Sequence, residues 1–226
     1  MASSAYQDLL DRLSSTGVQL LAVSKSKPAE EILAVYQWGQ RDFGENYVQE
    51  LVAKQPELPN DIRWHFIGHL QSNKVKYIAP FIYMIQSVDS LKLLLEIDKQ
   101  AEKNQRTINC LLQIHIAREE TKFGLDEREL DDLLDAVVAY RSAGKLSHIR
   151  ISGYMGMASM TGDQQTVHRE FSSLRSLFAK TKSTLPADPM DTLSMGMSSD
   201  YPIALNCGST MVRIGSLIFG ERKDVH

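Results

Sequence analysis

Short apolar runs alternate with longer stretches whose apolar residues recur at helical spacing, from one end of the sequence to the other. The first amphipathic stretch, 4–15, carries leucines on one face and predicts a leading helix. Residues 18–24 are almost continuously apolar, which is typical of a strand covered on both faces. Pro28 follows where a second helix begins, since proline is favoured in the first turn.

The same alternation continues to the end of the sequence and gives eight strand–helix units. Such units require parallel strands joined by right-handed crossovers. Eight units in 226 residues therefore predict an α/β protein, a single (β/α)8 TIM-type barrel over 1–226 with an extra N-terminal helix and no second domain. An open doubly wound sheet is less favoured, because no GxGxxG motif follows the first strand. The remaining predicted strands are 41–46, 64–68, 81–88, 109–116, 148–155, 192–196 and 211–215.

Composition and charge exclude several classes of function. The net charge is −3 and no cluster of Lys and Arg forms a basic stripe, so we expect no nucleic-acid partner. No stretch approaches the length of a membrane span, and the N-terminal residues lack the features of a signal peptide, so we expect a cytoplasmic protein. Cys110 and Cys207 lie far apart without a CxxC motif, and the histidines fall on different units, so we expect no metal site.

The candidate chemistry begins with Lys25. Functional groups of a barrel gather at the carboxyl ends of its strands, and Lys25 directly follows the first apolar run. A lysine there is costly unless it is paired, neutral or covalently modified. Desolvation would also make its amine a nucleophile toward an aldehyde. The alternative is a lysine whose ammonium reaches solvent from the strand end.

The loops after the seventh and eighth predicted strands suggest a phosphate site. Barrel phosphate sites are often built at this place from loop amides and the start of a short helix. Ser198 is predicted either to cap a helix or to donate to a phosphate oxygen, and Gly215 and Ser216 are expected to open the last helix with free N–H groups. Arg213 lies within a short apolar strand and requires a defined acceptor. An aldehyde-bearing phosphate with a ring nitrogen would satisfy the lysine, the phosphate loops and the arginine together.

These residues lie within segments that match a known family in order over nearly the whole chain. The segments are LLAVSKSKP (20–28), FGENYVQE (43–50), WHFIGHLQSNK (64–74), TKFGL (121–125), GYMGMASM (153–160), LSMGMSSDYPIAL (193–205) and GSTMVRIGSLIFG (208–220). With them the sequence resembles the YggS/PROSC family of pyridoxal phosphate homeostasis proteins. That family is similar in fold to the barrel of alanine racemase and of other fold type III enzymes that use this cofactor.

The resemblance implies pyridoxal 5'-phosphate (PLP) as the cofactor, held by Lys25 as a Schiff base, the internal aldimine. It implies that Arg213 faces the pyridine nitrogen and keeps it unprotonated, which weakens the ring as an electron sink. Lys122 stands where related racemases have an arginine toward the substrate carboxylate, so it is either a secondary ligand contact or an exposed loop lysine. The remaining implied cofactor contacts are Asn46, Met157, Ser198, Gly215 and Ser216.

The resemblance favours a carrier over an enzyme. Racemisation needs two positioned bases, and related racemases supply the second from an added domain that we do not expect here. We therefore expect a monomer that binds PLP, keeps the free aldehyde scarce and hands it to apo-enzymes. The alternative is a slow PLP-dependent amino-acid racemase or decarboxylase. A third hypothesis is a barrel enzyme acting on a sugar phosphate with Lys25 and no cofactor.

Overall fold

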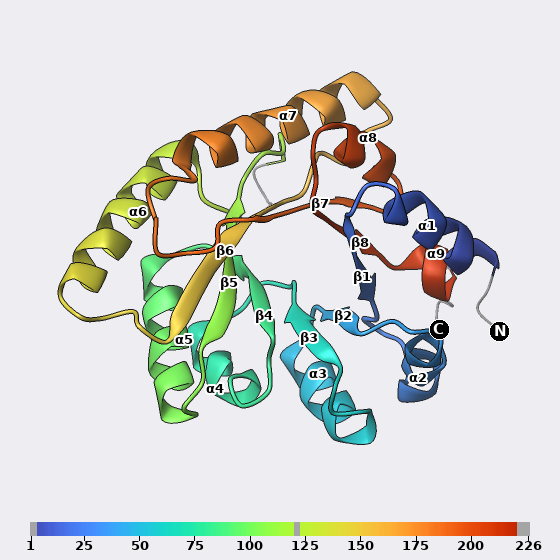
Figure 1. Cartoon of the computed structure of the whole chain (residues 1–226), viewed down its shortest axis with the longest axis horizontal. Helices are drawn as coiled ribbons and strands as arrows, with labels where there is room; N and C mark the ends of the chain where they lie inside the picture. Colours follow the sequence, from blue (N-terminus) through green and yellow to red (C-terminus); the bar gives the residue numbers. More distant parts are fainter. Residues whose placement is uncertain (1–3, 120–122, 221–226) are drawn as a thin grey trace.

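The described residues of the computed structural model, 4–119 and 123–220, form a closed barrel of parallel strands with helices around its outside (Figure 1). Each strand pairs with the next along the chain, and β8 (Met211–Ile214) pairs with β1 (Gln19–Val23) to close the barrel. The other strands are β2 (Asp42–Glu45), β3 (Arg63–Phe66), β4 (Met84–Val88), β5 (Ile108–Ile114), β6 (Ile149–Gly156) and β7 (Thr192–Met197). The predicted barrel is confirmed, as is the leading helix, α1 (Ser4–Ser14).

The outer layer consists of the helices that connect the strands. They are α2 (Ala29–Gln37), α3 (Val48–Lys54), α4 (Val75–Ile78), α5 (Leu91–Lys103), α6 (Glu127–Ser142), α7 (Gln164–Thr181), α8 (Tyr201–Asn206) and α9 (Ser216–Phe219), with 3-10 turns η1 (Gln55–Glu57) and η2 (Ser72–Lys74). Over the described ranges, no helix has the length and apolar composition needed to cross a membrane.

The largest difference from the predicted elements lies before β4. The apolar run 81–88 predicts a strand from its first residue, but the amides of Phe81 and Ile82 both donate to the carbonyl of Ile78. The turn that ends α4 therefore uses two N–H groups that a strand would need. The next helix, α5, begins at Leu91, because the Ser90 hydroxyl accepts from the amide of Leu93 and caps the helix.

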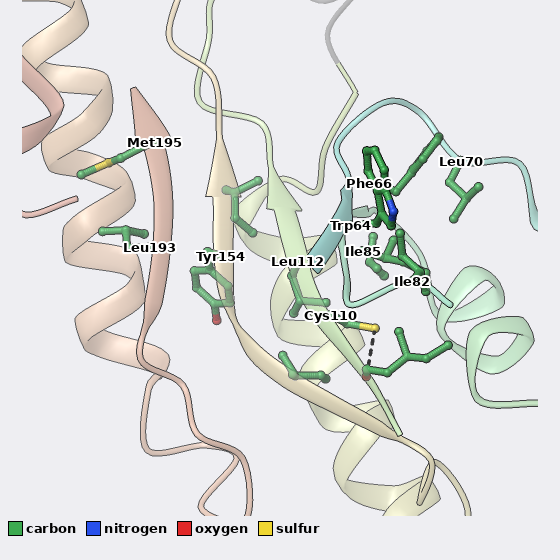
Figure 2. Close-up of a cluster of buried hydrophobic side chains, with 14 of the residues drawn as sticks. Trp64, Phe66, Leu70, Ile82, Ile85, Cys110, Leu112, Tyr154, Leu193 and Met195 are labelled. Atoms are coloured by element: carbon green, nitrogen blue, oxygen red, sulfur yellow. Dashed lines mark hydrogen bonds between the residues drawn. The ribbon is translucent and has the colours of Figure 1, made fainter. Parts of the chain in front are cut away.

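The main hydrophobic core fills the space between the barrel and its helices. Trp64 and Phe66 of β3 lie close to Ile82 and Ile85 in this layer (Figure 2). A second, smaller apolar cluster of Met84, Leu111 and Met155 is separate from it, and Met157 packs against that cluster. Truncation of a buried leucine or isoleucine to alanine in such a layer typically costs about 2–5 kcal/mol, so this layer contributes strongly to the stability of the barrel.

Candidate functional site

A tight turn holds Lys25 at the carboxyl end of β1. The amide of Ser24 donates to the carbonyl of Gly44 (3.0 Å), which continues the pairing of β1 with β2 for one more residue. The amide of Lys27 then donates back to the carbonyl of Ser24 (3.1 Å). Ser26, at the third position of this turn, has a φ of 61°, a positive value as in type II turns. Lys25 is therefore presented half-buried at the barrel rim by a fixed backbone.

A buried ion pair fixes the near side of this turn. Lys54 of α3 donates from Nζ to the carbonyl of Ser24 (3.0 Å) and to Oε1 of Glu45 (2.9 Å). The Ser24 hydroxyl donates to the same carboxylate oxygen (2.6 Å). Burial raises the pKa of Glu45, and the bonds from Ser24 and Lys54 oppose that rise. The pair thus ties the lysine turn to the next strand and its helix.

Glu50 of α3 fixes the far side of the turn. Its Oε2 accepts from the amide of Ser26 (2.8 Å) and from Nζ of Lys54 (3.0 Å). Although partial burial acts to raise it, these two bonds hold the pKa of Glu50 below its ordinary value. Both sequence neighbours of Lys25 are consequently held by charged groups of one helix.

Arg213 of β8 is a buried cation beside this turn. It is 3% exposed and pairs in register with Leu21 of β1. Its guanidinium donates to the carbonyl and the hydroxyl of Ser194 (2.7 and 2.8 Å) and to the carbonyl of Gly156 (2.9 Å). Burial lowers its pKa to about 10, so it stays charged at neutral pH. Within the described part of the chain, its Nε–H and its second Nη2–H have no acceptor, which leaves two donors for a ligand.

The β7 and β8 loops meet where the phosphate site is predicted, although their bonding differs from the prediction. The Ser198 hydroxyl accepts from the amide of Gly215 (3.3 Å), so the Gly215 N–H is not free. Ser198 does not cap α8, whose N-cap position is Asp200. The β7 strand is irregular before Ser198, with Gly196 at a φ of 96°, and this bulge redirects the loop toward Gly215. Ser216 is the exposed first residue of α9.

A lysine one turn away links the two halves of the rim. Lys27 donates from Nζ to the carbonyl of Phe219, the last residue of α9 (2.9 Å). The lysine turn after β1 and the short helix after β8 are thereby joined by a direct hydrogen bond.

Asn46 follows β2 and completes the neighbouring part of the rim. Its Oδ1 is buried and, among the described residues, has no hydrogen-bond partner, and the same holds for Oγ of Ser87, the penultimate residue of β4. A buried polar atom without a partner costs about 1–3 kcal/mol, so such atoms at a rim suit a bound ligand. Gly68 lies so close that a Cβ there would be 2.1 Å from the Asn46 carbonyl oxygen. Met157 lies half-buried just after β6.

Six of the eight candidate residues follow the ends of β1, β2, β6, β7 and β8, and Arg213 lies inside β8. These strands are consecutive around the closed barrel, so one stretch of rim holds them. The eighth candidate, Lys122, lies outside the described residues.

Lys54, Glu45 and Glu50 were not predicted as part of the site, because Glu50 and Lys54 resemble an ordinary helix face and Glu45 ends a mostly polar strand segment. A signal existed in the four-residue spacing of Glu50 and Lys54, which favours an ion pair.

The arrangement combines three chemical functions at one rim. Lys25 offers an amine, Arg213 offers two donors from a fixed buried cation, and the Ser198 hydroxyl and α9 amides offer donors for an anion. A planar ligand with an aldehyde, a ring nitrogen and a phosphate fits these groups. The fold and the site thus define a parallel (β/α)8 barrel with a lysine turn at its rim.

Comparison with known proteins identifies the family. The model of the family "Alanine racemase, N-terminal domain" matches residues 4–223. A pyridoxal phosphate homeostasis protein of Pasteurella multocida (strain Pm70) is 42% identical over 212 residues, covering 92% of this chain and 88% of the relative. The chain therefore belongs to the alanine racemase N-terminal domain family and, within it, to the pyridoxal phosphate homeostasis proteins, as its resemblance indicated.

Solved structures show the same fold. PipY of Synechococcus elongatus PCC7942 without PLP has a TM-score of 0.89 at 35% identity, covering 97% of this chain and 100% of PipY. PipY with PLP bound has a TM-score of 0.84 at 35% identity, covering 96% of this chain and 100% of PipY. Alanine racemase of Streptomyces lavendulae has a TM-score of 0.79 at 15% identity, covering 97% of this chain and 56% of the racemase. At this identity the similarity concerns the fold alone.

Proposed function

We propose that this chain binds pyridoxal 5'-phosphate at the barrel rim, with Lys25 as the point of covalent attachment, and serves intracellular PLP homeostasis. The observation that carries the proposal is the convergence of Lys25, Arg213 and the Ser198–Gly215 pair on three adjacent strands, β1, β8 and β7. The PLP bound to PipY, a relative with the same fold, supports the choice of cofactor.

Each residue has a defined task in this proposal. The cofactor supplies an aldehyde, which reacts with a lysine amine. Lys25 presents that amine from a turn held by Lys54 and Glu50, so little conformational entropy remains to be lost on binding. Ser198 donates its hydroxyl proton to the phosphate while it accepts from the Gly215 amide, and Gly215 and Ser216 place the first turn of α9 beside the phosphate, whose charge a helix start favours. Asn46 and Met157 line the pocket, and Lys122 is a secondary ligand contact.

Arg213 decides between carrier and enzyme in this proposal. A guanidinium directed at the ring nitrogen donates a hydrogen bond to it and keeps it unprotonated, because the arginine does not give up its proton. An unprotonated ring withdraws electrons weakly, so amino-acid chemistry is slow. The chain then works as a single-domain monomer that stores PLP and releases it to apo-enzymes, without efficient catalysis.

The experiment is an equilibrium titration of the purified protein with PLP, followed by visible absorbance. The proposal predicts a saturable band that Lys25→Ala lacks and that Lys145→Ala, a change of an exposed lysine on the α6–β6 connection, retains. Adding amino acids to the loaded protein then tests for turnover. Wild-type protein that gains no band, or a Lys25→Ala protein that gains the same band, would refute the proposal. Rapid turnover would replace the carrier role with an enzymatic one.

A further inference from the structure

The hydrogen bonds of Arg213 continue into a chain that crosses the barrel interior. Arg213 donates to the Ser194 hydroxyl, and that hydroxyl donates to Oε1 of Gln86 on β4 (2.7 Å). The Gln86 amide lies 3.0 Å from Nδ1 of His65 on β3. These side chains are nearly or fully buried, so no solvent supplies alternative partners.

This series of hydrogen bonds ends on an ion pair at the amino end of the barrel. Nε2 of His65 lies 3.0 Å from Oδ1 of Asp42, the first residue of β2. Arg63, at the start of β3, donates to both carboxylate oxygens of Asp42. Although burial acts to raise it, hydrogen bonds from Arg63 and His65 hold the pKa of Asp42 well below its ordinary value. A fixed carboxylate therefore anchors the end of the chain that is distant from the rim.

The donors and acceptors in this series allow its hydrogen bonds to run in one direction only. Asp42 is ionised and only accepts, so His65 donates to it from Nε2 and, being neutral, accepts at Nδ1. The Gln86 amide nitrogen lies between Nδ1 of His65 and Sδ of Met211 (3.1 Å), which are both acceptors. A flipped Gln86 would place its carbonyl oxygen against both of them. The Gln86 oxygen therefore faces Ser194, and the Ser194 hydroxyl keeps a lone pair for Arg213.

We propose that His65 and Gln86 are positioning residues that set the direction of this chain and thereby fix the Arg213 guanidinium for the cofactor. This inference rests on the proposed function, because it concerns the group that meets the ring nitrogen. Buried chains of hydrogen bonds polarise one another, so the neutral state of His65 affects the far end through each link. Without an acceptor at Nδ1, only the weak acceptor Sδ of Met211 opposes rotation of the Gln86 amide, and that rotation would cost Arg213 its bond to the Ser194 hydroxyl oxygen.

Three His65 variants separate the two hydrogen bonds of the imidazole. His65→Asn keeps an oxygen acceptor near the Nδ1 position, His65→Gln keeps a donor that reaches Asp42, and His65→Leu keeps neither. Ile85→Val is the matched control, because Ile85 precedes Gln86 on β4 but packs in the main core between the barrel and its helices. All proteins are measured for urea stability, apparent PLP dissociation constant and the absorption maximum of bound PLP. In the cofactor-free proteins, NMR follows hydrogen exchange of the Arg213 N–H protons.

The proposal predicts that His65→Leu and His65→Gln each raise the PLP dissociation constant by about tenfold, which is the effect of one charge-assisted hydrogen bond. Both variants should also shift the absorption maximum of bound PLP. The proposal also predicts that Arg213 N–H exchange becomes faster in both. His65→Asn and Ile85→Val are expected to keep a PLP dissociation constant and an absorption maximum close to those of the wild type, even where they lose stability. If His65→Leu does not fold, the comparison of His65→Asn with His65→Gln tests the proposal.

The inference would be overturned if His65→Asn and His65→Gln had the same PLP dissociation constant and absorption maximum. It would also be overturned if these two quantities followed the loss of stability alone. Wild-type protein without PLP binding would instead remove the proposed function, and this inference with it, so the two failures are distinct.

Discussion

Mild acid should destabilise the protein through His65. The imidazole is fully buried, and burial lowers its pKa despite the opposing hydrogen bond to Asp42; the neighbouring Arg63 acts in the same direction as burial. The ring of Tyr83 lies 5.4 Å from the imidazole ring. In the unfolded chain, a histidine has a pKa of about 6.5. Below that pH the unfolded state binds a proton that the folded state rejects, so stability falls as pH decreases toward the folded pKa.

The magnitude follows from linkage. Between about pH 7.5 and about pH 5.5, protonation of the unfolded histidine alone favours unfolding by roughly 1.4 kcal/mol, provided that the folded ring stays neutral. His65→Asn removes the titrating group and keeps an acceptor for Gln86.

The assay is urea unfolding of wild type and His65→Asn at both pH values, since the other histidines contribute equally to both proteins. The wild type should lose about 1.4 kcal/mol more than the variant between the two conditions. A difference below about 0.3 kcal/mol would mean that the folded imidazole accepts a proton easily. That result would refute the neutral, one-directional bonding assigned to it.

Three further predictions concern stability. Lys54→Met should destabilise by about 3–5 kcal/mol in urea unfolding, because it leaves the fully buried Glu45 carboxylate without its cation; the double variant with Glu45→Gln should recover part of this loss, and no recovery would contradict the pairing. Gly68→Ala should reduce the free energy of unfolding by at least about 2 kcal/mol, because its Cβ would be 2.1 Å from the Asn46 carbonyl oxygen. Gly162→Ala, whose Cβ would have no atom within 4 Å, should change stability by less than about 0.5 kcal/mol. Equal effects of the two changes would argue against the close approach of Gly68 to Asn46. Asp126→Ala should cost about 1 kcal/mol through loss of the capping box of α6, measured by thermal unfolding, and an unchanged midpoint would show that the cap is absent in solution.

The barrel could be predicted from the sequence because each strand is a short apolar run and each helix has an apolar face. The same signal could not give every boundary. Phe81 and Ile82 are apolar and yet their amides bond back to Ile78 in the turn that ends α4, since hydrophobic pattern records burial and not the acceptor of a given amide. The rule that barrel chemistry lies at the carboxyl ends of strands placed Lys25 and Ser198 on the rim.

The polar interior could not be predicted because its members are far apart in the sequence. Asp42, His65, Gln86 and Ser194 belong to four strands, and only closure of the barrel brings them together. His65, Gln86 and Ser194 stand within apolar runs, where a polar residue is unusual, so these three were visible as exceptions, whereas Asp42 lies in the mostly polar segment 41–46. Their bonding depends on strand register, and a one-residue shift would turn each side chain to the other face of the sheet.

The central claim is that Lys25 holds the cofactor covalently, and chemical trapping tests it most directly. The protein is incubated with PLP, reduced with borohydride, digested and mapped by mass spectrometry, with Lys25→Ala treated in parallel. Covalent attachment at Lys25 predicts one reduced pyridoxyl phosphate group, on the peptide that contains Lys25. The Lys25→Ala variant should carry no such group at any single preferred site. Attachment spread over surface lysines, or the same modified site in both proteins, would contradict it.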